Sequence, residues 1–254
     1  MAKKTIGIMG AMPEEITGVI ALLDNPRSIT VGRRIYTSGT INGIDTVVVF
    51  SRWGKVAASA TVSALIHHFN ITHLIFTGVA GAIHNELQPG DIVIASRLIQ
   101  HDMDARPLMP QFEIPLLGKT YFETDDSQLA IAQQAIAPLL QNDTLINLIG
   151  TKVVTTFGIT QPKLHIGNIA SGDKFFANNN DKENLLSALP DVLCVEMEGA
   201  AVAQVCYEYD IPFTVIRTIS DIADDNSHID FTAFIKNVSS KYSVAIIKQI
   251  YELQ

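Results

Sequence analysis

Cysteine is scarce in this sequence, whose 254 residues contain two, Cys194 and Cys206. They form no C-x-x-C pair and cannot supply the disulfide framework of a small secreted protein. No segment approaches the roughly 20 apolar residues that span a bilayer. The start, "MAKKTIGIMGAMPEE", has a short apolar run that ends in proline and glutamate, which argues against a signal peptide. We therefore expect a soluble protein of the reducing cytoplasm with no membrane partner.

Basic residues are also in deficit, with 18 Lys and Arg against 26 Asp and Glu and a net charge of −8. This balance disfavours DNA or RNA as the main partner. No two glycines are two positions apart, so the G-x-G-x-x-G dinucleotide motif is missing. The "GKT" at 118–120 follows Glu113, where a Walker A loop needs glycine.

Motifs of other enzyme classes are missing as well. The sequence contains neither a G-x-S-x-G elbow nor an H-E-x-x-H helix. The "HDMD" at 101–104 offers possible metal ligands, but it stands alone, whereas metals prefer several clustered ligands. We therefore expect no metal site.

The composition supports a substantial core, since 47% of the residues are hydrophobic and 17% are charged. That suits one compact domain or two small ones. Because no linker or repeat is evident, we treat 1–254 as a single domain. Short β-branched or apolar runs predict strands at 5–9, 46–50, 73–77, 91–96, 192–195 and 213–219. Helical patterns occupy 13–24, 55–69, 127–140, 199–209 and 231–253.

This alternation predicts an α/β fold around a central, mostly parallel sheet. Several of the strands are apolar on both faces, as in sheets covered by helices on two sides. Residues 101–126 break the pattern, because three prolines there oppose a regular element. A long excursion of this kind is often an active-site lid or a contact arm, although a plain surface loop is equally compatible.

Three acidic clusters each follow a predicted strand. Singly, such residues are explained by a helix dipole worth about 0.3–1 kcal/mol, by an N-cap or by a surface turn. The carboxyl ends of strands converge in an α/β fold, however, and ligands bind there. Together the clusters predict a pocket with several carboxylates and one cation, Arg217. Their members are Glu14 and Glu15; Glu196 and Glu198; and Ser220, Asp221, Asp224 and Asp225.

The spacing of Glu196 and Glu198 depends on the backbone between them. On an extended strand, residues two apart point to the same face, whereas on a helix they diverge. If 192–198 is extended, the two carboxylates reach one ligand. Adjacent ribose hydroxyls are suitable donors to such a pair.

Several stretches, taken together, resemble the 5′-methylthioadenosine/S-adenosylhomocysteine nucleosidases of the nucleoside phosphorylase superfamily. They are "GIMGAMPEE", "TGVAGA", "QPGDIVIAS", "SGDKFF", "VEMEGAA" and "RTISDIAD", in the family's order and spread from about residue 5 to residue 245. The resemblance implies a single-domain α/β fold with a twisted mixed sheet flanked by helices, usually in a homodimer. It also implies hydrolysis of an N-glycosidic bond that releases adenine, with no metal or organic cofactor.

The resemblance implies a role for each catalytic residue. Asp221 would protonate N7 of adenine, and Ser220 would help to hold its carboxyl group. Glu15 would be the base for the attacking water, and Arg217 would help to position the water and the carboxylates. This chemistry is consistent with a departing purine, which needs a general acid and leaves an oxocarbenium-like sugar that carboxylates stabilise.

The resemblance also implies contacts with the nucleoside. Glu198 would bind the ribose hydroxyls, with Glu196 assisting and Met197 packing under the sugar. A direct conflict arises here, because a strand extended through Glu198 points Met197 the other way. Either the chain bends at Met197, or Glu196 and Glu198 do not share a face. The remaining implied contacts are Phe175 stacked on adenine, the backbone of Phe176 at its edge, Phe231 beside the ribose and the 5′-thio group, and Met12 and Val79 lining the pocket.

The sequence departs from the family pattern mainly where the 5′ substituent and the purine edge would lie. Residue 79 is Val where several members carry Ser, and Trp53 stands where a small aliphatic residue is common. Two alternative activities therefore stay open, hydrolysis of aminodeoxyfutalosine and phosphorolysis. Arg33, Arg34 and Arg52 could serve a phosphorylase, but Glu14 and Glu15 would repel phosphate and suit a water nucleophile. A non-catalytic nucleoside-binding protein is a third reading, disfavoured because Asp221 and Glu15 are both present.

Overall fold

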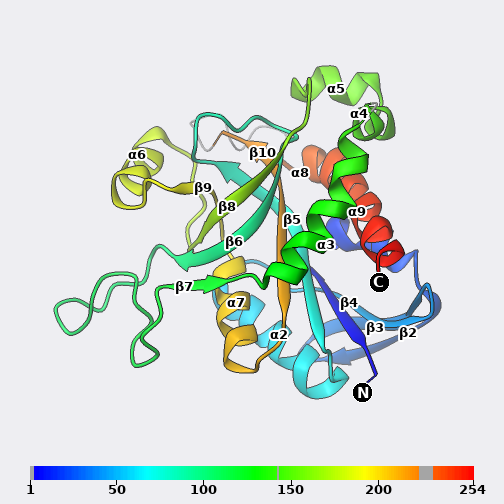
Figure 1. Cartoon of the computed structure of the whole chain (residues 1–254), viewed down its shortest axis with the longest axis horizontal. Coiled ribbons are helices and arrows are strands. Elements are labelled where there is room, and N and C mark those ends of the chain that lie inside the picture. Colours follow the sequence, from blue (N-terminus) through cyan, green and yellow to red (C-terminus); the bar gives the residue numbers. More distant parts are fainter. Residues whose placement is uncertain (1–2, 142, 223–230) are drawn as a thin grey trace.

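The computed structural model describes residues 3–141, 143–222 and 231–254 as a sheet flanked by helices (Figure 1). The strands are β1 (Thr5–Gly10), β2 (Asp24–Val31), β3 (Arg34–Ile41), β4 (Ile44–Phe50), β5 (His73–Ala82), β6 (Ile92–Gln100), β7 (Tyr121–Glu123), β8 (Leu164–Ser171), β9 (Val192–Glu196) and β10 (Phe213–Asp221). The helices are α1 (Pro13–Ile20), α2 (Lys55–Phe69), α3 (Asp126–Ile136), α4 (Thr144–Ile149), α5 (Thr151–Phe157), α6 (Asn179–Ala188), α7 (Gly199–Glu208), α8 (Phe231–Phe234) and α9 (Ser240–Glu252), with a 3₁₀ turn at Ala137–Leu140 and a π-helical turn, η2, at Ile235–Ser239.

The sheet is mixed, as the resemblance implied. Its strand order is β10-β6-β8-β9-β5-β1-β4-β3-β2, with β7 on β6, and β10 pairs with β5 as well as with β6. The strands β5, β9, β8, β6 and β10 therefore close into a ring, from which the other strands extend. The expectation of a mostly parallel sheet is wrong, because β5–β9, β6–β10 and the β2–β3–β4 meander run antiparallel.

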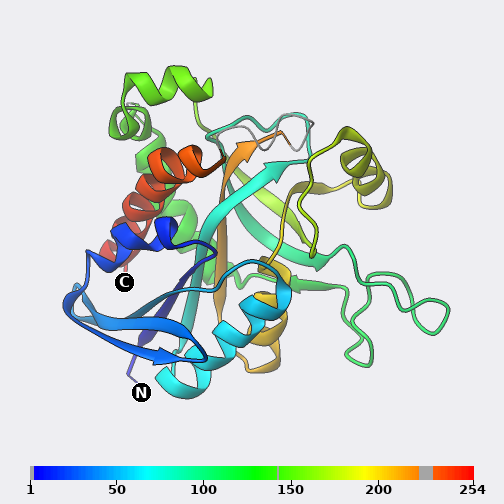
Figure 2. The ribbon, with the colours of Figure 1, turned by 180° about the vertical axis from the view of Figure 1, so that it is seen from behind.

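Helices cover the sheet on both sides, which explains why its strands are apolar on both faces (Figures 1 and 2). Along β1, Ile8 packs into the core beneath α1 and α9, whereas Met9 packs into the core beneath α2 and α7. In β4, Val48 and Val49 are divided in the same way. Successive strand residues point to opposite faces, so each strand contributes to two cores.

Several predicted helix bounds need correction. The expected helix at 13–24 ends at Ile20, and Asp24 already begins β2. The expected continuous helix at 231–253 is interrupted by η2, where one extra residue in the turn shifts the apolar stripe. The helix α6 was not predicted, because its sequence is polar and buries little beyond Leu185. It begins instead at a cap, where the Asn178 side chain accepts a bond from the Asp181 amide at 2.9 Å.

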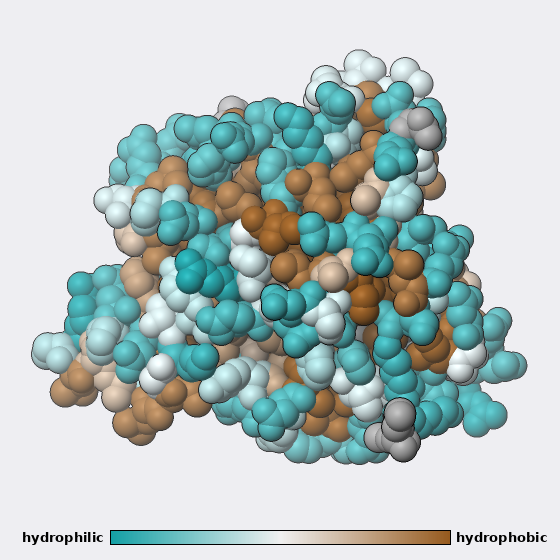
Figure 3. Space-filling view, viewed as in Figure 1, coloured by the Kyte–Doolittle hydropathy of each residue, from teal (hydrophilic) through white to brown (hydrophobic). Residues whose placement is uncertain are grey.

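The segment 101–126, which we call the arm, projects away from the body of the protein (Figures 1 and 2). Prolines keep most of it irregular, but β7 forms beyond the last of them, at Tyr121–Glu123, and pairs with β6. Leu108 and Leu116 are about nine-tenths exposed, at 90% and 93%. In the space-filling view, apolar surface gathers at the ends of the arm (Figure 3, lower left).

In the part of the chain that the structure describes, no helix is both long enough and apolar enough to cross a membrane.

Candidate active site

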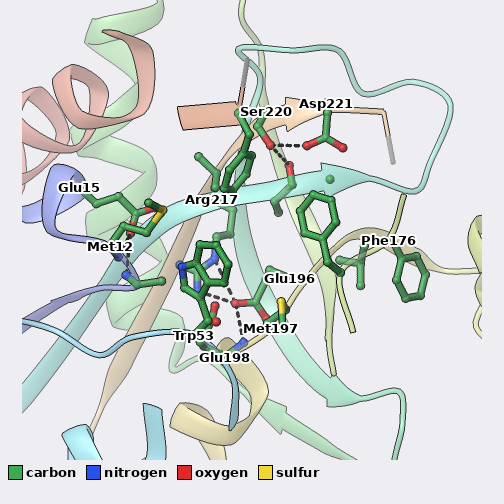
Figure 4. Close-up of a pocket in the computed structure, with 18 of the residues that line it drawn as sticks. Met12, Glu15, Trp53, Phe176, Glu196, Met197, Glu198, Arg217, Ser220 and Asp221 are labelled. Carbon is green, nitrogen blue, oxygen red and sulfur yellow. Dashed lines mark hydrogen bonds and ion pairs between the residues drawn. The ribbon is translucent and has the colours of Figure 1, made fainter. Parts of the chain in front are cut away.

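A cavity opens at the carboxyl ends of β1, β5, β9 and β10 (Figure 4). It offers about 690 Å³ of space free of protein atoms, its open mouth included. Asp224 and Asp225 of the third acidic cluster lie outside the described residues. All twelve residues predicted for the site line this cavity: Met12, Glu15, Val79, Phe175, Phe176, Glu196, Met197, Glu198, Arg217, Ser220, Asp221 and Phe231.

The chain bends at Met197, so 192–198 is not extended throughout and the first of the two alternatives holds. The strand β9 ends at Glu196, and Glu198 caps α7 with φ −136° and ψ −40°. The cause is the Glu196 carboxylate, which accepts bonds from the Gly199 amide at 2.8 and 2.9 Å and from the Glu198 amide at 3.2 Å. Folding the chain back over this carboxylate brings Glu196, Met197 and Glu198 to the same cavity, which removes the conflict over Met197.

Glu196 is committed to protein groups rather than left free for a ligand. It accepts a hydrogen bond from the Ser171 hydroxyl, and its Oε2 lies 2.6 Å from Nη2 of Arg217. Arg217 is 1% exposed; it also donates to the carbonyl oxygens of Phe76 and Ile216, and its guanidinium lies 4.1 Å from the Phe76 ring centroid. A buried ion pair of this kind fixes geometry, and removing one partner strands the other charge.

Glu198 is held by the start of α2. The Gly54 amide donates to its Oε1 at 2.8 Å. Burial, followed by the nearby charge of Glu196, raises the pKa of Glu198 to about 8. A carboxylate in this position gains from hydroxyl donors that a ligand brings, since they replace the water that it lost.

Glu15 is buried beside the end of β5. Its Oε2 accepts bonds from the amides of Ala11, at 2.6 Å, and Met12, at 2.9 Å, which closes a capping box on α1. Gly78 leaves room for it, because a Cβ at that position would lie 3.0 Å from Oε1 of Glu15. Burial raises the pKa of Glu15 to about 7, against the opposing pull of these amides and of Arg217. A general base works best with a pKa near the operating pH.

Asp221 stands at the opposite side of the cavity, at the end of β10 (Figure 4). The register of β10 against β5 shifts between Ile219 and Asp221, an irregularity of the kind that re-aims side chains. The Ser220 hydroxyl donates to Oδ2 of Asp221 at 2.5 Å. Phe175 and Phe231 form an edge-to-face pair, with ring centroids 5.8 Å apart. A flat aromatic ligand between Asp221 and this pair would meet a carboxyl group and apolar walls.

The site also contains residues that the sequence prediction did not include. The additional lining residues are Ala11, Trp53, Gly78, Ala80, Gly81, Lys174 and Val195. Trp53 is the single tryptophan of the sequence and remains 58% exposed at the mouth. Its place depends on the fold of β4 and α2, and no motif in the sequence marks it.

The possible metal ligands of "HDMD" and the arginines considered for phosphate binding contact other protein groups outside the cavity. Asp102 and Asp104 of "HDMD" pair with Lys55 and Arg106 at 2.6 and 2.5 Å. Within residues 3–141, 143–222 and 231–254, no group of three or more His, Cys, Asp or Glu could hold a metal ion.

In the same ranges, the cations that line the cavity are Lys174 and Arg217. Arg34 and Arg52 donate to backbone carbonyl oxygens outside it.

Comparison with known proteins agrees with this geometry. The chain matches the sequence model of the Phosphorylase superfamily over residues 5–250. It is 34% identical over 248 residues to the 5′-methylthioadenosine/S-adenosylhomocysteine nucleosidase of Shewanella sediminis, covering 98% of this chain and 99% of that one.

Solved structures are similar as well. One is the 5′-methylthioadenosine/S-adenosylhomocysteine nucleosidase from S. pneumoniae with a transition-state inhibitor, at a TM-score of 0.84, 34% identity and coverage of 98% of this chain and 100% of that one. Another is the futalosine hydrolase of Helicobacter pylori, at a TM-score of 0.82, 32% identity and coverage of 99% and 98%.

Proposed function

The chain belongs to the phosphorylase superfamily and, within it, to the 5′-methylthioadenosine/S-adenosylhomocysteine nucleosidases, and we infer from this that it is an N-glycosyl hydrolase. It cleaves the bond between adenine and the sugar of 5′-methylthioadenosine, of S-adenosylhomocysteine or of both. The observation that best supports this function is that Glu15, Glu198 and Asp221 line the same cavity.

We propose that Asp221 is the general acid. A purine leaves as a poor anion unless it is protonated, and a proton delivered to N7 lets the electron pair of the C1′–N9 bond remain on the base. The Ser220 hydroxyl, 2.5 Å from Oδ2, orients the Asp221 carboxyl group. The aromatic pair Phe175–Phe231 supports the placement, because it gives the adenine ring an apolar wall beside that carboxyl.

The sugar that remains carries positive charge. We propose that Glu15 activates the water that attacks this sugar and that Glu198 binds its hydroxyl groups. Glu15 takes the proton of the water that attacks C1′, and its pKa of about 7 suits a base at neutral pH. Glu198 accepts bonds from the ribose hydroxyls. Because Glu196 is paired with Arg217, it acts by holding Glu198 and Arg217 in place rather than by touching the ribose.

Hydrolysis is favoured over phosphorolysis because the cations of the cavity are already paired. Among the described residues, Lys174 and Arg217 are the cations that line it; Lys174 pairs with Asp181 at 2.7 Å and Arg217 with Glu196 at 2.6 Å. A phosphate anion would have to compete with these carboxylates for a cation, whereas a water nucleophile needs none.

The direct test measures adenine released from methylthioadenosine with and without added phosphate. We expect equal rates, and a strict requirement for phosphate would show a phosphorylase instead. S-adenosylhomocysteine and aminodeoxyfutalosine, assayed in parallel, rank the 5′ substituents. The similarity to a futalosine hydrolase makes aminodeoxyfutalosine the relevant competitor. Its preferential turnover would replace the proposed substrate without changing the chemistry.

We further propose that the arm contacts a second copy of the chain in a homodimer. Among the described residues, none of the arm lines the cavity, so a contact surface explains the arm better than a lid. Leu108 and Leu116 expose apolar surface that a monomer would leave in water. Light scattering is expected to give twice the mass of the chain, and the double variant Leu108→Asp/Leu116→Asp is expected to lower it. A monomeric wild type contradicts the proposal.

The cytoplasm is the proposed compartment, because Cys194 and Cys206 are both free and buried. Cell fractionation tests this, and recovery from an oxidising compartment would refute it.

A further inference from the structure

Three segments that are distant in the sequence meet at Asp102, the second residue of the arm. Its Oδ1 lies 2.6 Å from Nζ of Lys55, at the start of α2. Its Oδ2 accepts a bond from the Asp173 amide at 2.9 Å, in the loop that follows β8. The Asp173 carboxylate closes the circle, since its Oδ1 accepts the Lys55 amide at 2.8 Å. We call these residues, Lys55, Asp102 and Asp173, the latch.

Each side of the latch carries part of the cavity wall. On one side, Asp173 is followed directly by Lys174, Phe175 and Phe176, which line the cavity. On the other, Lys55 is preceded by Gly54, whose amide donates to Glu198, and by Trp53 at the mouth. We call Phe175 and Phe176 the aromatic wall, and Trp53 and Gly54 the Glu198 holder. The latch therefore joins the aromatic wall to the Glu198 holder.

The latch depends on charge and on close approach. Burial alone would raise the pKa of Asp102, but the hydrogen bonds from Lys55 and from the Asp173 amide outweigh it and lower that pKa. Asp102 is therefore charged at neutral pH. Gly54 has φ +90°, and a Cβ there would lie 2.9 Å from Oδ1 of Asp173. The approach of the two segments thus requires glycine at this position.

We propose that Asp102 is a positioning residue for the nucleosidase reaction: without lining the cavity, it fixes the aromatic wall and the Glu198 holder relative to each other. The proposal rests on the proposed function. Its physical basis is preorganisation, because walls that are already in place when the nucleoside arrives need not be ordered at the expense of binding. Loosening the latch should weaken substrate capture more than it slows the chemical step.

The chain offers a matched control for Asp102. Asp104 lies two residues further along the same arm and forms its own ion pair with Arg106, at 2.5 Å, without touching the loop at 173–176. We expect Asp102→Asn to raise KM for methylthioadenosine on the order of tenfold, as loss of a charge-assisted bond does, with a smaller change in kcat. Asp104→Asn should leave both constants unchanged. Lys55→Gln should raise KM as Asp102→Asn does, and it serves if the latter fails to fold.

Trp53 supplies a readout that does not need activity. It is the single tryptophan and lies two residues before Lys55, so its fluorescence reports on the Glu198 holder. In the ligand-free protein, Asp102→Asn should make Trp53 easier for acrylamide to quench, whereas Asp104→Asn should not. Equal KM and equal quenching in the two variants would overturn the proposal. A wild type that releases no adenine would instead refute the proposed function, and the quenching comparison would still decide whether the latch holds its loops.

Discussion

Asp221→Asn is expected to lower kcat for methylthioadenosine by roughly 10²–10⁴-fold, the usual contribution of a general acid. Asparagine has the shape of the carboxyl group and can still accept the bond from the Ser220 hydroxyl, which lies 2.5 Å away. It has no proton acidic enough to give to N7. Because the aromatic pair Phe175–Phe231 is untouched, KM should change little. Steady-state measurement of adenine release separates the two constants.

A substrate whose leaving group needs no proton isolates the effect. In the 4-nitrophenyl glycoside of 5-methylthioribose, the leaving group is 4-nitrophenolate, a stable anion that departs with the electron pair of the C1–O bond. The Asp221→Asn variant should therefore cleave this substrate at a rate close to that of the wild type. The kcat of Ser220→Ala for methylthioadenosine should lie between those of the wild type and Asp221→Asn, because this change removes the group that orients the acid but not the acid itself. Equal losses on both substrates would show that Asp221 holds the site together rather than protonating the base.

The position of the site could be predicted from the sequence because it depends on topology. Acidic residues follow three apolar runs, and strands end together in an α/β fold. In the structure, Glu15, Glu198 and Asp221 line one cavity, as this topological argument predicts. Side-chain type and distance from a strand end were enough, and no knowledge of the exact strand order was needed.

The remaining strands escaped prediction for identifiable reasons. The β3–β4 hairpin turns at Asn42 and Gly43, both with positive φ, as a type I′ turn requires. The turn pair was visible in the sequence, but β2 (DNPRSITV) begins with five residues that are not apolar and is exposed along nearly its whole length, and β3 (RIYTSGTI) carries a polar run with a glycine, so neither resembled a buried strand. The strand β8 carries a glycine at 167 and a histidine at 165, and its pairing with β6 and β9 supplies what its own propensity lacks.

The bend at Met197 could be named from the sequence as one of two alternatives, but it could not be chosen. Strand and turn are equally compatible with "VEMEGAA" locally. The choice is made by Arg217 and Ser171, which hold the Glu196 carboxylate where it can accept the amides of residues 198 and 199. These partners lie more than 20 residues away in either direction, so the local backbone is decided by tertiary contacts.

Glu15→Gln is expected to reduce kcat/KM for methylthioadenosine by roughly 10²–10⁴-fold at neutral pH, because glutamine cannot take the proton of the attacking water. In the wild type, kcat/KM reports on the free enzyme, in which the pKa of Glu15 is about 7. The wild-type rate should therefore fall as the pH drops below 7, and the residual rate of the variant should lack this limb. A variant with the same acid limb would show that another group is the base.

The same carboxyl group links stability to pH, and the link tests its burial without any substrate. In the unfolded chain the pKa of Glu15 is near its ordinary value of 4.5, and folding raises it to about 7. The folded protein therefore binds a proton that the unfolded chain gives up, and stability falls as pH rises from 4.5 through 7. The loss is on the order of 3 kcal/mol for a shift of this size. The raised pKa of Glu198 acts in the same direction over a range that extends to about 8.

Ligand-free wild type should melt at a lower temperature at pH 8 than at pH 6. The melting temperature of Glu15→Gln should fall less over that interval, with Glu198→Gln as the matched comparison. Parallel melting curves for wild type and Glu15→Gln would mean that Glu15 is solvated, and a solvated carboxylate would no longer be poised to act as a base at neutral pH.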